Sequence, residues 1–349
     1  MLNRFAMALV LVAGLGLVGC NGGDTTASTT TGSTTGTTGS GGTTGTTGKT
    51  YKVAVIPKGS THEFWKAVHA GANDAGKEFG ADITFKGPEK EDDRQSQVDM
   101  VDNIVSAGTD AIVLAPLDAD GLRKPVDNAI AKKIPVVIID SALNGSGIAS
   151  FVATDNEKGG TMAADEMIKR LGGKGKIVVL RYAPGSASTE AREKGFEDEI
   201  KAKGAGIQIV SDNQYAGATA ESAAKKSDDL LATMKGPDGK LTIDGIFCPN
   251  ESSTLGMLAT LRAHSWNGKV KFMGFDSSDK EVEALQKGDV DGLVVQSPYK
   301  IGYEGVKAAV ETLQGKKVEA RVDTGATLVT KDNMDTPENQ KLLKPKQVD

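Results

Sequence analysis

Polar side chains follow several predicted strands of this 349-residue chain, at the point where each strand ends. His62 begins a predicted helix directly after the first strand, and Asp140 and Asp276 each end a later strand. Aromatic, carboxylate, carboxamide and guanidinium groups collect at these ends. Aromatic rings cover the C–H faces of a sugar ring, and Asp, Asn, Gln and Arg offer paired hydrogen bonds to adjacent hydroxyl groups. The residue types therefore predict a site for a sugar.

The sequence offers no positive sign of catalysis or of metal binding. It lacks a G-x-S-x-G elbow, an H-E-x-x-H motif and a C-x-x-C motif. Gly172–Lys176 lacks the spacing of a phosphate-binding loop, and Leu117–Gly121 lacks the closing Glu of a calcium loop. His69 and His264 are interpreted as ordinary helix residues. We therefore expect no catalytic residue, no metal ion and no cofactor.

The amino terminus predicts export and lipid anchoring. Met1–Cys20 has one Arg, then an apolar run shorter than the roughly 20 residues of a membrane span. Leu17-Val18-Gly19-Cys20 resembles a bacterial lipobox, in which the Cys is acylated; the alternative is a plain signal peptide or a short anchor helix. Residues 21–49 are almost all Thr, Gly and Ser, which predicts a disordered tether. We expect a protein outside the cytoplasm, attached to membrane lipid through Cys20.

Composition narrows the classes of partner. A net charge of −5 and a pI near 5.5 argue against nucleic acid, because phosphate binding needs clustered Lys and Arg. Once Cys20 is acylated, only Cys248 remains, so no intrachain disulfide is expected. The chain beyond the tether is long enough for two domains with separate cores. We expect a monomer.

Short apolar runs alternate with helical patterns, which predicts parallel sheets covered by helices on both faces. The predicted strands of the first half are Lys52–Ile56, Asp82–Phe85, Ala111–Leu114 and Pro135–Ile139. Those of the second half are Ile177–Leu180, Ile207–Val210, Ile243–Phe247 and Val270–Met273. A strand ending in Asp-Ser occurs in each half, at Asp140 and at Asp276. This weak repeat predicts two similar lobes whose strand ends line one cleft.

Several motifs carry a resemblance to a known family. They are His62-Glu63-Phe64-Trp65, Ile139-Asp140-Ser141, Ala153-Thr154-Asp155-Asn156, Arg192-Glu193-Lys194-Gly195-Phe196, Pro249-Asn250-Glu251, Gly274-Phe275-Asp276 and Gln296-Ser297-Pro298-Tyr299. With them, Tyr51 to Lys331 resembles the type I periplasmic sugar-binding proteins of the ribose-binding group. The resemblance implies an α/β fold of two similar doubly wound parallel-sheet lobes joined by a three-segment hinge.

The resemblance also implies which residues face the ligand. The family's segment Asn-Asn-Pro-Phe-Phe carries over to His62, Phe64 and Trp65, and its strand-end Asp to Asp140, where Ser141 replaces the usual Arg. The remaining implied ligand residues are Arg192, Tyr215, Asn250, Asp276 and Gln296, with Glu190 as the alternative to Arg192. The departures from the ribose pattern leave pentoses, hexoses, inositols and furanose signals as candidate ligands.

The implied hinge divides the chain into two lobes. Thr154, Asp155 and Ser297 are the expected hinge residues, with a third crossing near Thr324. The expected N-terminal lobe comprises residues 50–153 and 297–325, the C-terminal lobe residues 154–296 and 326–335, and the tail residues 336–349. The resemblance implies that bound sugar favours a closed form, which the permease of an ABC importer then recognises.

Three alternatives share some of these features. A sugar-responsive repressor of the lactose-repressor family would need an amino-terminal helix-turn-helix, where this chain has a signal and a tether. A receptor for chemotaxis or quorum sensing would use the same binding for signalling. A secreted hydrolase would use Asp140 and Asp276 as an acid–base pair, although symmetry explains this pair more simply.

Overall fold

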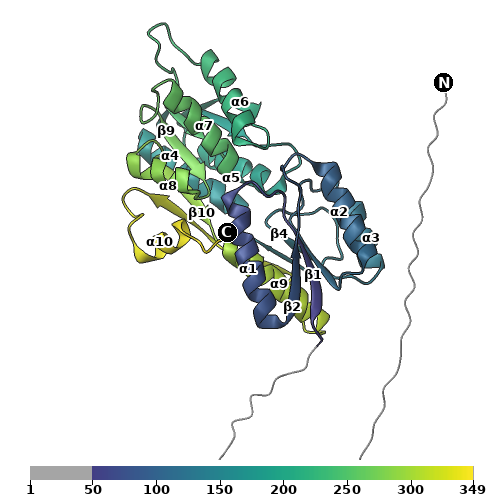
Figure 1. The fold of residues 1–349 in the computed structure, drawn as a ribbon. Helices are drawn as coiled ribbons and strands as arrows, with labels where there is room; N and C mark the ends of the chain where they lie inside the picture. The colour runs from purple at the N-terminus through teal and green to yellow at the C-terminus, as the bar shows by residue number, and fades with distance from the viewer. Residues whose placement is uncertain (1–48, 349) are drawn as a thin grey trace, which may run out of the picture. The chain divides into compact units, whose positions relative to one another are not determined.

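The structure is a computed structural model that describes residues 49–348 (Figure 1). The expected signal segment with Cys20, and the expected tether up to Gly48, lie outside these residues. No helix within residues 49–348 combines the length and the apolar character that a membrane crossing requires.

The first sheet is wholly parallel and belongs to what we call the N-terminal lobe. Its strand order is β11-β5-β4-β3-β1-β2. The strands are β1 (Tyr51–Ile56), β2 (Ala81–Phe85), β3 (Ala111–Leu114), β4 (Val136–Ile139), β5 (Ser150–Ala153) and β11 (Arg321–Asp323). Four of them coincide with the predicted strands of the first half to within one residue at each end.

The second sheet belongs to the C-terminal lobe and repeats this order as β12-β10-β9-β8-β6-β7. Its strands are β6 (Lys174–Arg181), β7 (Gly206–Tyr215), β8 (Gly245–Phe247), β9 (Lys271–Phe275), β10 (Gly292–Gln296) and β12 (Ala326–Thr330). Only the edge strand β12 departs from the expected parallel arrangement, because it pairs antiparallel with β10. Only Thr324 and Gly325 separate β12 from β11 of the other sheet. To run parallel to β10, the chain would first have to cross to the far end of the second sheet, which a two-residue link does not allow.

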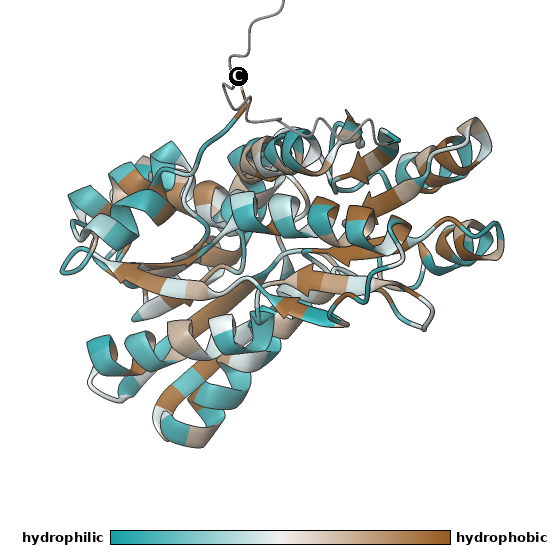
Figure 2. Ribbon diagram, turned by 90° about the horizontal axis from the view of Figure 1, so that it is seen from below, coloured by the Kyte–Doolittle hydropathy of each residue, from teal (hydrophilic) through white to brown (hydrophobic). Residues whose placement is uncertain are grey.

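Helices cover both faces of each sheet, and the side chains of each strand alternate between the two faces. In the N-terminal lobe, Val53 and Val113 pack under α1 (Glu63–Phe79) and α9 (Pro298–Leu313). Ile112 and Leu114 pack on the other face, under helices α2 and α3. These helices are α2 (Arg94–Ala107) and α3 (Arg123–Ala131). Figure 2 shows apolar strands between helices whose outward surfaces are more polar.

The C-terminal lobe is built in the same way. Ile177 and Phe247 pack against one pair of helices, whereas Val178 and Phe272 pack against the helices of the opposite face. The first pair is α4 (Asn156–Leu171) and α5 (Ala187–Lys203), and the other helices are α6 (Ala220–Thr233), α7 (Glu251–Ala263), α8 (Asp279–Lys287) and α10 (Pro337–Leu343). The expected α/β fold with two similar sheets is therefore confirmed.

In each lobe, two helices cross so closely that only glycine fits at the crossing. A Cβ atom on Gly71 of α1 would lie 1.9 Å from the carbonyl oxygen of Tyr299 on α9. A Cβ atom on Gly160 of α4 would lie 2.0 Å from the carbonyl oxygen of Arg192 on α5.

Three chain crossings connect the two sheets and lie beside one another. They run from β5 to α4, from β10 to α9 and from β11 to β12. Thr154 Oγ1 donates to Gln296 Oε1 at 2.8 Å and lies 3.5 Å from Thr324 Oγ1. The amide of Asp155 donates to Asp323 Oδ1 at 3.2 Å. Hydrogen bonds thus join all three crossings.

Candidate functional site

Carboxyl ends of parallel strands from both sheets border a single cleft. Its lining combines charged, amide, hydroxyl and aromatic side chains from both lobes. The lining residues are Lys58, His62, Phe64, Trp65, Glu91, Asp140, Tyr182, Ser188, Thr189, Arg192, Asn250, Glu251, Asp276 and Gln296. Sugar binding in proteins calls for this mixture of donors, acceptors and rings.

Two aspartates occupy equivalent places in the two lobes. Asp140 follows β4 and Asp276 follows β9, and both have left-handed backbone conformations, with φ of 62° and 78°. The amide of Asp140 donates to Val152 O and that of Asp276 to Val294 O, each at 3.0 Å. The strand-end repeat in the sequence therefore corresponds to a repeated local geometry that turns a carboxylate into the cleft.

The carboxylate of Glu91 is the centre of the N-terminal side of the cleft. His62 Nδ1 lies 2.6 Å from Glu91 Oε1, and the indole N–H of Trp65 donates to the same oxygen at 2.6 Å. Burial alone would raise the pKa of Glu91 and lower that of His62. Their mutual attraction outweighs burial, so that the pKa of Glu91 falls to about 2 and that of His62 rises to about 9. Both groups are therefore ionised at neutral pH.

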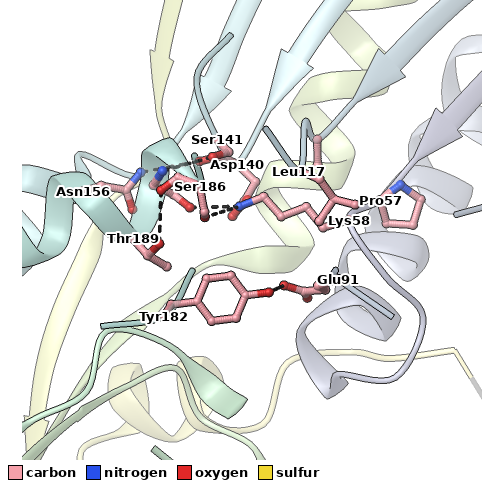
Figure 3. A network of polar contacts seen from close by, with 12 residues as sticks. Pro57, Lys58, Glu91, Leu117, Asp140, Ser141, Asn156, Tyr182, Ser186 and Thr189 are labelled. Carbon is pink, nitrogen blue, oxygen red and sulfur yellow. Dashed lines mark hydrogen bonds and ion pairs between the residues drawn. The ribbon is translucent and has the colours of Figure 1, made fainter. Parts of the chain in front are cut away.

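A buried lysine connects the lobes next to this pair. Lys58 Nζ lies 3.0 Å from Asp140 Oδ2 in its own lobe (Figure 3). It also donates to Ser188 Oγ of the other lobe at 3.0 Å. A third contact reaches Ser186 Oγ at 3.3 Å. Because the lysine is only 3% exposed, these contacts replace the water that its ammonium group would otherwise bind.

On the C-terminal side, Arg192 extends from α5 into the cleft. Its Nε donates to Asn156 Oδ1 at 2.8 Å, and its Nη1 donates to Pro249 O at 2.9 Å. Its guanidinium carbon lies 3.9 Å from the centre of the Phe275 ring. Burial lowers the pKa of Arg192, although Asp276 and Asp140 oppose the shift. Its buried Nη2 has no hydrogen-bond partner within residues 49–348, which leaves a charged donor for a ligand oxygen.

Asp276 and Glu251 complete the C-terminal side. Asp276 accepts from Gln296 Nε2 at 2.6 Å and from the amide of Glu251 at 3.0 Å, and burial raises its pKa. The Glu251 carboxylate accepts from the amides of Glu63 and Phe64 at the start of α1, at 3.2 and 3.3 Å. Burial, together with repulsion from Asp276, raises the pKa of Glu251 to about 7.

Direct contacts between the lobes leave little free space in the cleft. The free volume is about 30 Å³, room for one or two water molecules. A sugar would therefore enter only when the lobes move apart and these cross-cleft contacts open. Within residues 49–348, no group of three or more His, Cys, Asp and Glu side chains is arranged to hold a metal ion.

Comparisons with known proteins identify the family. Residues 53–317 match the family model described as the periplasmic binding protein domain. The chain belongs to this family. The expected membership among type I periplasmic sugar-binding proteins is thus confirmed, and the family is one of transport binding proteins and not of enzymes.

Individual periplasmic binding proteins are similar over most of the chain. A solved carbohydrate-transporter solute-binding protein of Agrobacterium radiobacter, in complex with D-arabinose, is 37% identical, covering 84% of this chain and 99% of that one with a TM-score of 0.80. A solved ABC transporter solute-binding protein of Agrobacterium vitis with bound D-fucose is 38% identical, with coverage of 84% and 100% and a TM-score of 0.79. A ribose import binding protein of Haemophilus influenzae is 26% identical over 267 residues, 76% of this chain and 87% of that protein.

The periplasmic binding protein fold brings most of the predicted ligand residues together. Those that line the cleft are His62, Phe64, Trp65, Asp140, Arg192, Asn250, Asp276 and Gln296. Ser141 lies just behind the lining, where its Oγ accepts from the amide of Ser188 at 3.0 Å. Asn250 also caps α7, because its Oδ1 accepts from the amide of Ser253 at 3.2 Å. Its two roles are compatible, since capping uses the oxygen alone.

Two predicted residues lie elsewhere. Tyr215 ends β7, is 38% exposed and is not among the lining residues, whereas Tyr182 at the end of β6 is. Glu190 is exposed and accepts from the amide of Gly185 at 2.7 Å, so that of the two alternatives only Arg192 lines the cleft.

Several lining residues are not predicted from the sequence to face the ligand. They are Lys58, Glu91, Tyr182, Ser188, Thr189 and Glu251. Lys58 and Tyr182 follow β1 and β6, so the strand-end rule would have found them had it been applied to every strand. Glu91 lies in the loop after β2, and its sequence neighbourhood gives no comparable signal.

Proposed function

We propose that this chain captures a monosaccharide or a related polyol in the cleft between its lobes and delivers it to an ABC importer. The main support for this proposal is the set of side chains that line the cleft. Asp140 and Asp276 come from different lobes, and Trp65 adds an aromatic ring. The sugars bound to the two solved relatives, D-arabinose and D-fucose, support a ligand of this size and polarity.

The balance of charge in the cleft favours a neutral ligand. Lys58, His62 and Arg192 carry positive charge and face the carboxyl groups of Glu91, Asp140, Asp276 and Glu251, of which Glu251, with its pKa raised to about 7, is only partly ionised at neutral pH. A charged ligand would disturb this buried balance, whereas hydroxyl groups both donate and accept. A wrong epimer would leave a buried group unmatched, at a cost of about 1–3 kcal/mol.

Binding in this proposal exchanges one set of bonds for another. The open form loses the contacts of Lys58 with Ser188 and of Glu251 with the start of α1. A sugar bound to one lobe offers its hydroxyl groups to the other, so it restores the closed form through its own bonds. The crossings at Thr154, Asp155 and Ser297 would serve as the hinge.

The same proposal assigns the amino terminus to membrane attachment. The lipobox-like sequence that ends at Cys20, followed by the Thr- and Gly-rich segment, supports an acylated protein tethered outside the cytoplasm. Metabolic labelling with a radioactive fatty acid should label the full chain and not its Cys20→Ser variant. Equal labelling of both would contradict this anchor.

A thermal-shift screen tests the ligand. The full chain carrying Cys20→Ser would be screened against pentoses, hexoses, inositols and other polyols. A sugar at 100 times its Kd adds about 2.7 kcal/mol to stability. The shift should be lost in Asp276→Ala and kept in Tyr215→Ala, whose side chain is exposed. A flat response across the whole panel would contradict the sugar assignment.

A further inference from the structure

The C-terminal end of the described chain passes from one lobe to the other. We call Lys344–Val348 the C-terminal strap; it follows α10, which is fixed to the C-terminal lobe. Leu343 is 1% exposed in the core of that lobe, and Gln340 Nε2 donates to Met334 O at 2.8 Å. Ser277 Oγ also donates to Leu342 O at 3.4 Å. The start of the strap therefore moves with the C-terminal lobe.

The far end of the strap contacts the N-terminal lobe. The amide of Val348 donates to Lys66 O on α1 at 3.3 Å, and Lys346 Nζ forms an ion pair with Asp74 on the same helix. Asp74 is held in place by the hydroxyl of Tyr299, which donates to its Oδ2 at 2.9 Å. Figure 1 accordingly places the C-terminal end beside α1.

The middle of the strap borders the candidate site. Pro345 and Gln347 line a small hollow together with Phe64, Glu251 and Asp276, all of which also line the cleft. The strap therefore covers one side of the cleft. Unlike the three crossings, it joins the lobes through contacts that can break, because its link to α1 is not covalent.

We propose that the C-terminal strap is a fourth link between the lobes that walls one side of the cleft and slows the release of bound ligand. This inference rests on the proposed function of the cleft. Five extended residues span about 18 Å at the most, so separation of the lobes at the cleft pulls on Lys346 and Val348. Lys346 is exposed on 61% of its side chain, and such an ion pair breaks readily, so that the link is reversible.

Ligand release gives the first test. A full-length Cys20→Ser chain would be compared with one that stops after Leu343 and with Lys346→Ala. Stopped-flow tryptophan fluorescence would follow the release of any sugar that shifts the melting temperature. Release should be roughly 3- to 10-fold faster in the truncated chain and faster to a smaller degree in Lys346→Ala. The control is Lys341→Ala, which removes a lysine of α10 that forms no ion pair within residues 49–348. Unchanged release in both strap variants would overturn the inference.

Hydrogen exchange without ligand gives the second test and separates the two proposals. The amides of Glu63 and Phe64 donate to Glu251 across the cleft, so their exchange reports opening of the closed form directly. Truncation should speed exchange of these two amides, whereas Lys341→Ala should not. If no sugar binds the full chain, the proposed function fails, and this exchange still decides the strap. Equal exchange with and without the strap would refute it.

Discussion

The hydroxyl of Tyr182 donates a hydrogen bond to Glu91 Oε2 at 2.6 Å, across the cleft between the two lobes. The same carboxylate holds His62 and the indole of Trp65 through its other oxygen. One side chain therefore orders two residues of its own lobe and one of the other (Figure 3 shows the contact with Tyr182). Burial and the neighbouring carboxylate raise the pKa of Tyr182 well above its usual value, which keeps the phenol a donor.

Removing the hydroxyl of Tyr182 should weaken the closed form while the ring stays in place. A hydrogen bond to a charged group contributes about 1.5–3 kcal/mol, so Tyr182→Phe should weaken sugar binding by about tenfold or more. Isothermal titration calorimetry would measure the change. Tyr215→Phe is the matched control in the same lobe, because Tyr215 is exposed and lies outside the lining. Equal affinities for both variants would show that the contact does not support closure.

Trp65 should matter for folding as well as for binding. It is 3% exposed, packs in the core of the N-terminal lobe and also lines the cleft. Trp65→Ala should lower the free energy of unfolding by about 3–5 kcal/mol, the usual cost of emptying such a site. Urea unfolding would measure it. Trp65→Phe, which keeps an aromatic ring but loses the donor to Glu91 and part of the ring volume, should cost clearly less. A small loss in Trp65→Ala would contradict the burial.

The ion pair of His62 and Glu91 should make stability depend on pH. The pKa of His62 is raised from 6.5 to about 9, so its contribution is full below pH 6.5 and is lost as the pH rises through 9. The pKa of Glu91 is lowered from 4.5 to about 2, so its contribution is full above pH 4.5 and is lost as the pH falls through 2. The pair therefore stabilises the fold most between about pH 4.5 and 6.5.

Urea unfolding between pH 7.5 and 10 would check this dependence, since Glu251, with a pKa of about 7, titrates below that range. The protein should lose stability more steeply than His62→Gln, by about 2–3 kcal/mol over the whole rise in pH. Parallel slopes for the protein and His62→Gln would contradict the raised pKa.

The helix crossings predict intolerance of a single methyl group. Gly71→Ala and Gly160→Ala should each lower the free energy of unfolding by about 1–3 kcal/mol or more, because the added Cβ atom meets backbone that can yield only by moving a helix. Gly121→Ala is the control, since its Cβ atom would meet nothing closer than 3.4 Å. Chemical denaturation would measure the free energy of unfolding of the three variants. Equal values for Gly121→Ala and the two crossing variants would contradict the close packing.

The sequence was informative where a pattern repeats. Val53 and Val113 lie in short apolar runs that are typical of buried strands, and Asp140 and Asp276 follow such runs at their carboxyl ends. The two aspartates were therefore predictable as cleft residues. The choice between Tyr182 and Tyr215 was not, because it depends on strand order. β6 lies inside its sheet and is followed by Tyr182, whereas Tyr215 ends the edge strand β7 and lies outside the lining.

Other features depend on contacts between distant segments. Glu91 is a site residue because it binds His62, Trp65 and Tyr182, and no local sequence pattern connects these three partners to it. The three residues of β11 are too few for an alternating pattern to identify them as a strand. The C-terminal strap likewise could not be predicted from its own sequence, because its role depends on its contacts with α1.

The left-handed backbone at Asp140 and Asp276 limits how this cleft can be redesigned. Apart from glycine, Asn and Asp tolerate that conformation best, and β-branched residues tolerate it worst. A designer who seeks a new selectivity would keep these two positions and vary the rest of the lining, above all Lys58 and Tyr182. The two aspartates are then fixed reference points in any library, and the chemistry between them is the part open to choice.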